Sequence, residues 1–164
     1  MKLLPVPDLM CRSIYDIRPE ALKARGARFV LLDIDNTVAP YTVDTAGPEL
    51  LAWVEAMRGA GLALFILSNN RGGRPARFAA QLGLPYIKHA RKPFPKKARE
   101  VISREGYRPG ETAVVGDQIY TDALCARLCG AMAVTVRPIA FTNIWLRLRY
   151  WAEAPFRLAW YFIR

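Results

Sequence analysis

Asp33 and Asp35 stand one residue apart, directly after the apolar residues 29–32. Side chains alternate between the two faces of an extended chain, so we expect both carboxylates to lie on the same side of it. Two negative charges this close repel each other unless a proton or a cation lies between them. Because carboxylate oxygens are suitable ligands for Mg²⁺, the pair favours a magnesium site. The alternative is a strand that ends in an Asx turn, in which Asn36 and Thr37 satisfy the backbone of the loop.

Apolar segments and segments with helical spacing alternate along the chain, and these elements must position the two carboxylates. Apolar strands separated by helices are typical of a parallel sheet that is covered on both faces. The sequence therefore predicts an α/β fold with a doubly wound parallel sheet. We expect strands at 29–33, 62–67, 85–87, 113–115 and 132–136, and helices at 48–58, with Thr45 as its cap, 75–82, 96–104 and 121–128.

Polar residues follow three of the predicted strands, and a lysine precedes a predicted helix. Taken one at a time, such residues are typical of helix-capping loops, turns and ordinary surface lysines. Ligands of parallel sheets bind at the carboxyl ends of the strands, however, so the joint placement of these residues favours a common site. The candidates are Asp33, Asp35, Ser68, Asn69, Lys92, Asp117 and Asp122.

The length of 164 residues suits one ordinary domain with a single core, and 52% of the residues are hydrophobic. Cys11, Cys125 and Cys129 match neither a disulfide framework nor a complete zinc site, which favours a reducing compartment such as the cytoplasm. No apolar segment approaches the length of a membrane span. We expect a core over residues 1–140 and a helical tail over 141–164.

Most of the net charge of +10 lies in two regions of the chain. Residues 71–108 carry eleven Lys and Arg residues against two acidic ones, and residues 137–164 carry five against one. An excess confined in this way indicates an anionic partner, either lipid or nucleic acid.

Four short motifs, DIDNT, LSNN, ARKP and GDQIYTD, occur in this order between residues 33 and 122. Together they closely resemble the four motifs of the haloacid dehalogenase-like (HAD) phosphohydrolases. The DNT, ARKP and GDQxxTD variants are similar to those of the YqeG-type group of subclass IIIA, whose relatives include phosphatidylglycerophosphate phosphatases. The resemblance extends from SIYDIRPEALKARG to VRPIAFTN and fades in the last twenty residues. It implies a Rossmann-like HAD core.

The resemblance also implies how the acidic residues would act. Asp33 would be the nucleophile that forms an aspartyl-phosphate, which replaces one difficult hydrolysis by two easier displacements. Asp35 would be the general acid and base. Mg²⁺ would be bound by the Asp33 carboxylate, the main-chain carbonyl of Asp35 and Asp117.

The remaining motif residues would bind the phosphoryl group or support its binding. Ser68 and the backbone N–H of Asn69 would hold it, and Lys92 would offset its charge. Asp122 would orient Lys92 or a metal-bound water rather than bind the metal directly. Asn36 would shape the loop, as would Thr37, without a chemical role.

The spacing of the motifs leaves no room for a sizeable cap domain. About one helix is predicted between Asp35 and Ser68, and another between Ser68 and Lys92. An uncapped site is open to a substrate too large to enclose, such as a lipid headgroup in a bilayer or the end of a nucleic acid. It is less suited to a small sugar phosphate, because no lid excludes water.

The tail over residues 141–164 is rich in aromatic residues and arginine, a composition that suits the headgroup layer of a membrane. The alternative is a terminal helix whose aromatic side chains pack on the sheet. We expect Pro155 to divide the tail into two helices. The tail contains Phe141, Trp145, Tyr150, Trp151, Phe156, Trp160, Tyr161 and Phe162, with Arg147, Arg149, Arg157 and Arg164 among them.

The basic region in the middle of the chain also has two interpretations. Arg71, Arg74 and Arg77 recur at three-residue spacing on a predicted helix, which is usual for a solvated helix face. Further basic residues flank Lys92, so we expect an anionic bilayer to dock the site toward its substrate. These residues are Lys88, Arg91, Lys96, Lys97 and Arg99.

The sequence thus predicts a magnesium-dependent phosphatase that converts phosphatidylglycerophosphate to phosphatidylglycerol as a peripheral protein on the cytoplasmic face of a membrane. Its expected partners are an anionic phospholipid surface and the phosphorylated lipid, without a specific nucleic acid. One alternative is a HAD phosphatase for nucleic-acid ends or nucleotides, which the basic charge permits. Another is a non-catalytic module that keeps the fold to bind a partner, and the intact motif residues argue against it.

Overall fold

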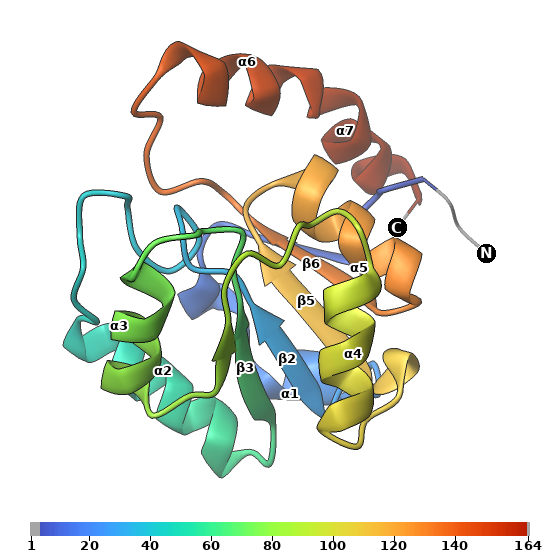
Figure 1. Ribbon diagram of the computed structural model, residues 1–164. Coiled ribbons are helices and arrows are strands. Elements are labelled where there is room, and N and C mark those ends of the chain that lie inside the picture. Colours follow the sequence, from blue (N-terminus) through green and yellow to red (C-terminus); the bar gives the residue numbers. More distant parts are fainter. Residues whose placement is uncertain (1–3, 164) are drawn as a thin grey trace.

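Six parallel strands form one sheet in the computed structural model, which describes residues 4–163 (Figure 1). The strand order is β1-β6-β5-β2-β3-β4, and every neighbouring pair is parallel. The predicted doubly wound parallel sheet is confirmed. The strands are β1 (Leu9–Cys11), β2 (Phe29–Leu32), β3 (Ala63–Leu67), β4 (Tyr86–Ile87), β5 (Thr112–Gly116) and β6 (Met132–Val136).

Helices cover both faces of the sheet, because successive side chains of each central strand point to opposite faces. From β2, Val30 and Leu32 pack in a cluster with α1, α2 and α3, whereas Phe29 and Leu31 pack with α4 and α5. Figure 1 shows these two layers on either side of the strands. The helices are α1 (Pro19–Lys23), α2 (Pro48–Gly59), α3 (Arg74–Leu82), α4 (Lys96–Arg104) and α5 (Leu124–Cys129), with short turns η1 (Ile14–Asp16), η2 (Pro109–Glu111) and η3 (Ile119–Ala123).

The structure corrects three local expectations. The three-residue strand β1, which pairs with β6, was not predicted. Thr45 does not cap α2, because the helix begins at Pro48 and its N-cap is Gly47. The helix predicted over 121–128 is present, but it begins earlier, with the π-helical turn η3, in which the amide of Ala123 donates to the carbonyl of Gln118, and it continues as α5.

The carboxyl ends of the central strands meet at one edge of the sheet. Leu32 of β2 pairs with Val115 of β5 and with Ile66 of β3, so the residues that follow these three strands lie side by side. Between β2 and β3 the chain adds α2 and a loop, and between β3 and β4 it adds α3. In the described part of the chain, neither insertion amounts to a cap domain.

The tail forms two helices, α6 (Ile144–Ala152) and α7 (Ala154–Ile163), which meet at Glu153. The predicted division near Pro155 is therefore confirmed, since this proline lies in the first turn of α7. In Figure 1, α6 lies beyond the carboxyl ends of the strands and does not pack on a face of the sheet. Arg164 lies outside the described residues. No helix of the described chain has the length and apolar character needed to span a bilayer.

Candidate active site

Asp33 and Asp35 come directly after β2, where the chain leaves the sheet. The amide of Asp33 still donates to the carbonyl of Val115 on β5 at 2.9 Å, which fixes Asp33 between the two central strands. Asp33 is buried and Asp35 is half-buried. The two carboxylates therefore lie in different surroundings, although they are only one residue apart.

Lys92 lies between two carboxylates. Its Nζ is 2.6 Å from Oδ1 of Asp33 and 2.6 Å from Oδ1 of Asp122. Burial alone would lower the pKa of Lys92, but the two carboxylates raise it above its ordinary value, so the ammonium keeps its charge. Burial raises the pKa of Asp33 to about 7, against the opposing effect of Lys92. The site thus holds a fixed positive charge beside the predicted nucleophile.

Asn69, which follows β3, holds the loop that carries Lys92. Its side-chain oxygen accepts from the amide of Lys92 at 2.7 Å, and its side-chain NH₂ donates to the Lys92 carbonyl at 3.0 Å. Ser68 is fully buried, and its hydroxyl oxygen accepts from the amide of Asn70 at 3.1 Å. Of these two residues at the end of β3, Asn69 lines a cavity that is described below, whereas Ser68 does not line it and lies in the interior of the loop.

A cluster of three buried carboxylates follows β2 and β5. Ligand oxygens of Asp33, Asp117 and Asp122 lie within 4.8 Å of one another, and the hydroxyl of Thr37 is 3.2 Å from both Asp33 and Asp117. Burial and the neighbouring carboxylates raise the pKa of Asp117 well above its ordinary value. Lys92 pairs with Asp33 and Asp122 but not with Asp117, so one ammonium does not balance the three carboxylates, and this set of oxygen donors fits a hard divalent cation such as Mg²⁺.

Asp122 is held by protein groups rather than left open for a ligand. One of its oxygens pairs with Lys92, and the other accepts from the amide of Gln118 at 3.2 Å and from the hydroxyl of Thr121 at 3.1 Å. Distances between carboxylates alone would include Asp122 among the metal ligands. Its hydrogen bonds instead favour a role in orienting Lys92.

Gly116 makes the approach of Asp122 possible. A Cβ atom at position 116 would lie 2.2 Å from Cγ of Asp122. The GD pair of the fourth motif therefore has a packing reason: glycine lets the turn η3 return the Asp122 side chain against the end of β5.

Asp35 is held by two residues that the sequence did not assign to the site. Oδ1 of Asp35 is 2.7 Å from Nε of Arg74, and Oδ2 accepts from the side chain of Asn70 at 2.9 Å. Arg74 also contacts Asp44 at 3.0 Å and the carbonyl of Pro40 at 2.7 Å. Arg74 therefore links Asp35, which the resemblance makes the general acid and base, to the loop over residues 39–44.

The placement of Arg74 corrects the interpretation of residues 71–77 as a solvated basic face. Arg74 is buried, whereas Arg71 and Arg77 are exposed, and Arg77 pairs with Asp44 at the surface. The three-residue spacing is real, but the loop over 39–44 covers the middle arginine. Asn70 was missed as well, and its place in the LSNN motif directly after Asn69 is the signal that could have identified it.

A cavity of about 290 Å³ opens above these groups. It brings together five of the candidate residues with four that were not candidates. Of these four, Tyr41 comes from the loop after β2 and Arg149 from α6, and the other two are Gln118 and Thr121. Asp117 lies just below, on the wall of a smaller adjoining hollow. The lining residues are Asp33, Asp35, Tyr41, Asn69, Lys92, Gln118, Thr121, Asp122 and Arg149.

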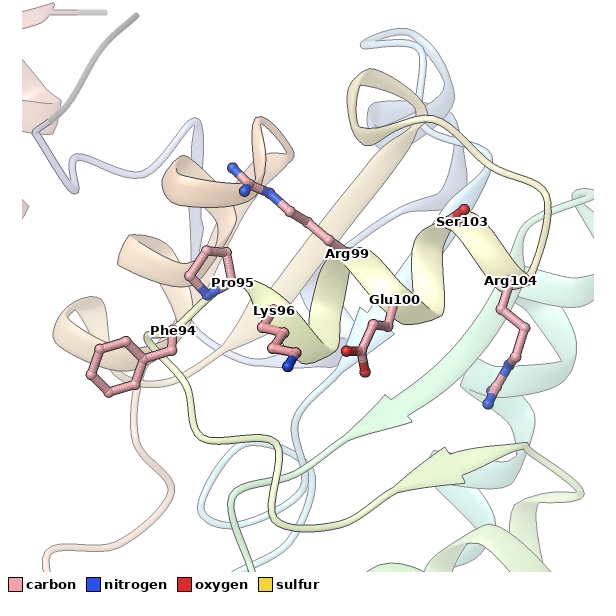
Figure 2. Close-up of a pocket in the computed structure, with 7 residues that line it drawn as sticks. All are labelled: Phe94, Pro95, Lys96, Arg99, Glu100, Ser103 and Arg104. Carbon is pink, nitrogen blue, oxygen red and sulfur yellow. The ribbon is translucent and has the colours of Figure 1, made fainter.

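A wider hollow runs along α4, and Figure 2 shows the side chains that line it. Arg99, which belongs to the basic region around Lys92, donates there to the carbonyl of Leu128. None of its lining residues was predicted to act on phosphate, and the motif carboxylates lie elsewhere. The residues are Phe94, Pro95, Lys96, Arg99, Glu100, Ser103 and Arg104.

A family model described as mitochondrial PGP phosphatase matches residues 2–139. The chain belongs to this family. The probable phosphatase YqeG of Bacillus subtilis is 34% identical over 143 residues, which cover 87% of this chain and 83% of that protein. The mitochondrial phosphatidylglycerophosphatase GEP4 of Saccharomyces cerevisiae is 32% identical over 122 residues, which cover 66% of this chain and 65% of the yeast protein. The predicted resemblance to YqeG-type HAD phosphatases is confirmed.

Solved structures show that this HAD phosphatase shares its fold with other hydrolases. A putative HAD family hydrolase from Streptomyces avermitilis matches with a TM-score of 0.55 and 22% identity, over 70% of this chain and 79% of that chain. The cobalt-bound deoxy-D-mannose-octulosonate 8-phosphate phosphatase of Haemophilus influenzae matches with a TM-score of 0.53 and 18% identity, over 77% of each chain. These structures show the fold, and the family and its phosphatase members show a phosphoric monoester hydrolase.

Proposed function

We propose that this phosphatase hydrolyses the terminal phosphomonoester of phosphatidylglycerophosphate with the help of Mg²⁺ and through an aspartyl-phosphate on Asp33. The observation that carries the proposal is the position of the Asp33 carboxylate, held by Lys92 beside Asp117 at an open cavity, in a chain of the PGP phosphatase family.

Each step of the proposed reaction uses a side chain at the cavity. A carboxylate oxygen of Asp33 attacks phosphorus, and the bond to the glycerol oxygen breaks while Asp35 donates a proton to that oxygen. Water then attacks the phosphorus, Asp35 takes the proton of the water, and the Asp33 carboxylate is released with inorganic phosphate. Lys92 offsets charge on the phosphoryl oxygens in both displacements.

Asp33, Asp117 and the main-chain carbonyl of Asp35 would hold the magnesium ion. Bound there, Mg²⁺ supplies the positive charge that allows a carboxylate to approach a phosphate dianion. The three clustered carboxylates with one ammonium support this assignment. The proposal also assigns phosphoryl binding to the backbone N–H of Asn69 and to Ser68, although the Ser68 side chain does not line the cavity.

We place the enzyme, as a peripheral protein, on the cytoplasmic face of an anionic membrane. The support is the tail surface, which we define as Trp145, Leu148, Trp151, Tyr161 and Phe162. All five side chains are exposed, Trp145 by 74%, Trp151 by 72% and Phe162 by 87%. Large exposed apolar groups of this kind suit the boundary between headgroups and acyl chains, and the net charge of +10 favours anionic lipid.

The test is phosphate release from phosphatidylglycerophosphate in detergent micelles, with Mg²⁺ and with excess chelator. The wild type should release phosphate only with the metal, and Asp33→Asn should lose turnover while it keeps its thermal unfolding temperature. Full activity in chelator would contradict the metal, and near-normal activity of the variant would remove Asp33 from the mechanism.

A 3′-phosphorylated oligonucleotide, assayed side by side, separates the proposed substrate from the nucleic-acid alternative. We expect faster release from the lipid. Faster release from the oligonucleotide would favour the alternative, and no release from either would favour the non-catalytic module.

A further inference from the structure

Arg149 brings a positive charge from α6 to the wall of the active-site cavity. Its Nη1 donates to the side-chain oxygen of Gln118, which lines the same cavity. Arg149 belongs to none of the four motifs, and the sequence placed it only among the arginines of the tail. The cavity therefore contains a cation that the proposed reaction does not use.

This cation differs from the other two beside the reacting carboxylates. Lys92 lies between two aspartates, and Arg74 pairs with Asp35. The guanidinium of Arg149 has no carboxylate within ion-pair distance among the side chains that the structure describes. Its charge is thus available to an anion that enters the cavity.

The helix that carries Arg149 is fixed in place, because α6 is attached to the site at both ends. Before the helix, the side chain of buried Asn36 accepts from the amide of Ala140 and donates to its carbonyl, both at 2.8 Å. After the helix, the buried carboxylate of Glu153 accepts from the amide of Tyr120 in η3 at 3.1 Å. The loops after β2 and β5, which carry the catalytic aspartates, therefore also hold α6.

The chemistry of the substrate supplies a second anion. Phosphatidylglycerophosphate carries a terminal phosphomonoester and, three carbon atoms away, a phosphodiester that leads to the diacylglycerol. A guanidinium binds two phosphate oxygens at once in a planar geometry. We propose that Arg149 is a specificity-determining residue that binds this phosphodiester, an inference that rests on the function proposed above. The open site would thereby distinguish the lipid headgroup from phosphomonoesters that carry a single phosphate.

The test compares two soluble substrates, so that membrane contact plays no part. One is a short-chain phosphatidylglycerophosphate below its critical micelle concentration, and the other is glycerol 3-phosphate, which has the phosphomonoester without the phosphodiester. The readout is the ratio of kcat/KM for the two. We expect Arg149→Ala and Arg149→Gln to lower this ratio about tenfold or more, as for the loss of a charge-assisted hydrogen bond. Arg147→Ala, a matched exposed arginine on the same helix, should keep the wild-type ratio.

The ratio keeps the outcomes apart, because unfolded protein in a preparation affects both substrates equally and cancels. A wild-type ratio near one would mean that the proposed lipid substrate itself is wrong. A high wild-type ratio that Arg149→Ala retains would overturn the role of Arg149 and leave the proposed function in place. Equal losses on both substrates would also overturn it, because they would place the effect at the reacting phosphate.

Replacement of the acyl chains gives a further control. Deacylated phosphatidylglycerophosphate has both phosphates and no lipid tail, so recognition of the phosphodiester predicts the same loss in Arg149→Ala as for the short-chain lipid. A loss confined to the acylated substrate would show that Arg149 contacts the lipid tail region, and would contradict the proposal.

Discussion

At the scale of single residues, the charge balance around Lys92 governs the site. Its ammonium group is 2.6 Å from carboxylate oxygens of both Asp33 and Asp122, and all three residues are buried. A buried ammonium without such partners would lose its proton. Because the carboxylates keep it charged, Lys92 is preorganised to stabilise negative charge on a phosphoryl group bound beside Asp33.

We therefore expect Lys92→Ala to lower kcat/KM by a factor on the order of a hundred or more, the effect of removing one preorganised electrostatic donor. The measurement is steady-state phosphate release at saturating Mg²⁺. Lys88→Ala, which replaces an exposed lysine nearby in the chain, should change it by less than about twofold. A loss of less than about threefold in Lys92→Ala would mean that the ion pairs of Lys92 are structural only.

Arg74 and Arg77 provide a matched pair for stability, because one is buried and the other exposed on the same helix. Removal of one partner from a buried ion pair costs about 3 to 5 kcal/mol, whereas an exposed pair contributes at most about 1 kcal/mol. We expect Arg74→Ala to show the larger loss and Arg77→Ala the smaller one in urea unfolding. Equal losses would contradict the buried role of Arg74.

The same pair shows what the sequence could and could not predict. Asp33 and Asp117 were predicted because each follows a strand whose apolar pattern is clear, and Lys92 because it precedes a predicted helix in the ARKP motif. Arg74 was assigned to the surface, because its spacing from Arg71 and Arg77 is that of a solvated face. Only the fold of the loop over 39–44, which supplies carbonyls to the guanidinium, places it inside.

At the scale of elements, the junction of β5 and η3 positions Asp122. We expect Gly116→Ala to cost about 1 to 3 kcal/mol through overpacking and to reduce activity strongly, since Asp122 must move away from Lys92. Gly59→Ala is the control, because its Cβ would meet nothing within 4 Å. Thermal unfolding and kcat/KM of both variants test this expectation. Wild-type activity of Gly116→Ala would contradict the contact.

The carboxylates after β2 and β5 also link metal binding to pH. Burial raises the pKa of Asp33 to about 7, so in the protein without a cation its contribution to stability is fully present below the unfolded value of about 4 and is lost as pH rises through about 7. A cation relieves the repulsion that grows over this range. We expect Mg²⁺ to raise the unfolding temperature more at about pH 8 than at about pH 5, and Asp117→Asn to reduce the difference. An equal increase at both pH values would contradict the linkage.

The elements that the sequence missed have few residues or an unusual geometry. Strand β1 has only three residues, and it pairs with β6, which is more than a hundred residues away in the sequence. The turn η3 departs from an α-helix because the amide of Ala123 donates to the carbonyl of Gln118, five residues back, while the carboxylate of Asp122 pairs with Lys92. Apolar periodicity identified the longer strands and helices, because burial alone determines their pattern.

At the scale of the whole molecule, α6 joins the catalytic cavity to the outer surface. Arg149 lines the cavity, while Trp145, Leu148 and Trp151 of the same helix are exposed. The sequence indicated two tail helices but not their place above the site, because that place depends on buried polar contacts of Asn36 that no apolar pattern records. A bilayer against the tail surface would therefore lie close to the opening of the cavity.

This arrangement predicts binding to anionic vesicles through the tail surface. The wild type should cosediment with vesicles rich in phosphatidylglycerol more than with phosphatidylcholine vesicles, and added salt should weaken the difference. The double variant Trp145→Ser/Trp151→Ser should have an affinity for anionic vesicles at least about tenfold lower, because the free energy of burying two indoles in the membrane is lost. Tyr15→Ser, which replaces an exposed aromatic residue of η1, should bind as the wild type does. Equal binding to both kinds of vesicle would contradict the preference for anionic lipid, and an undiminished affinity of the double variant would contradict the tail surface as the site of membrane contact.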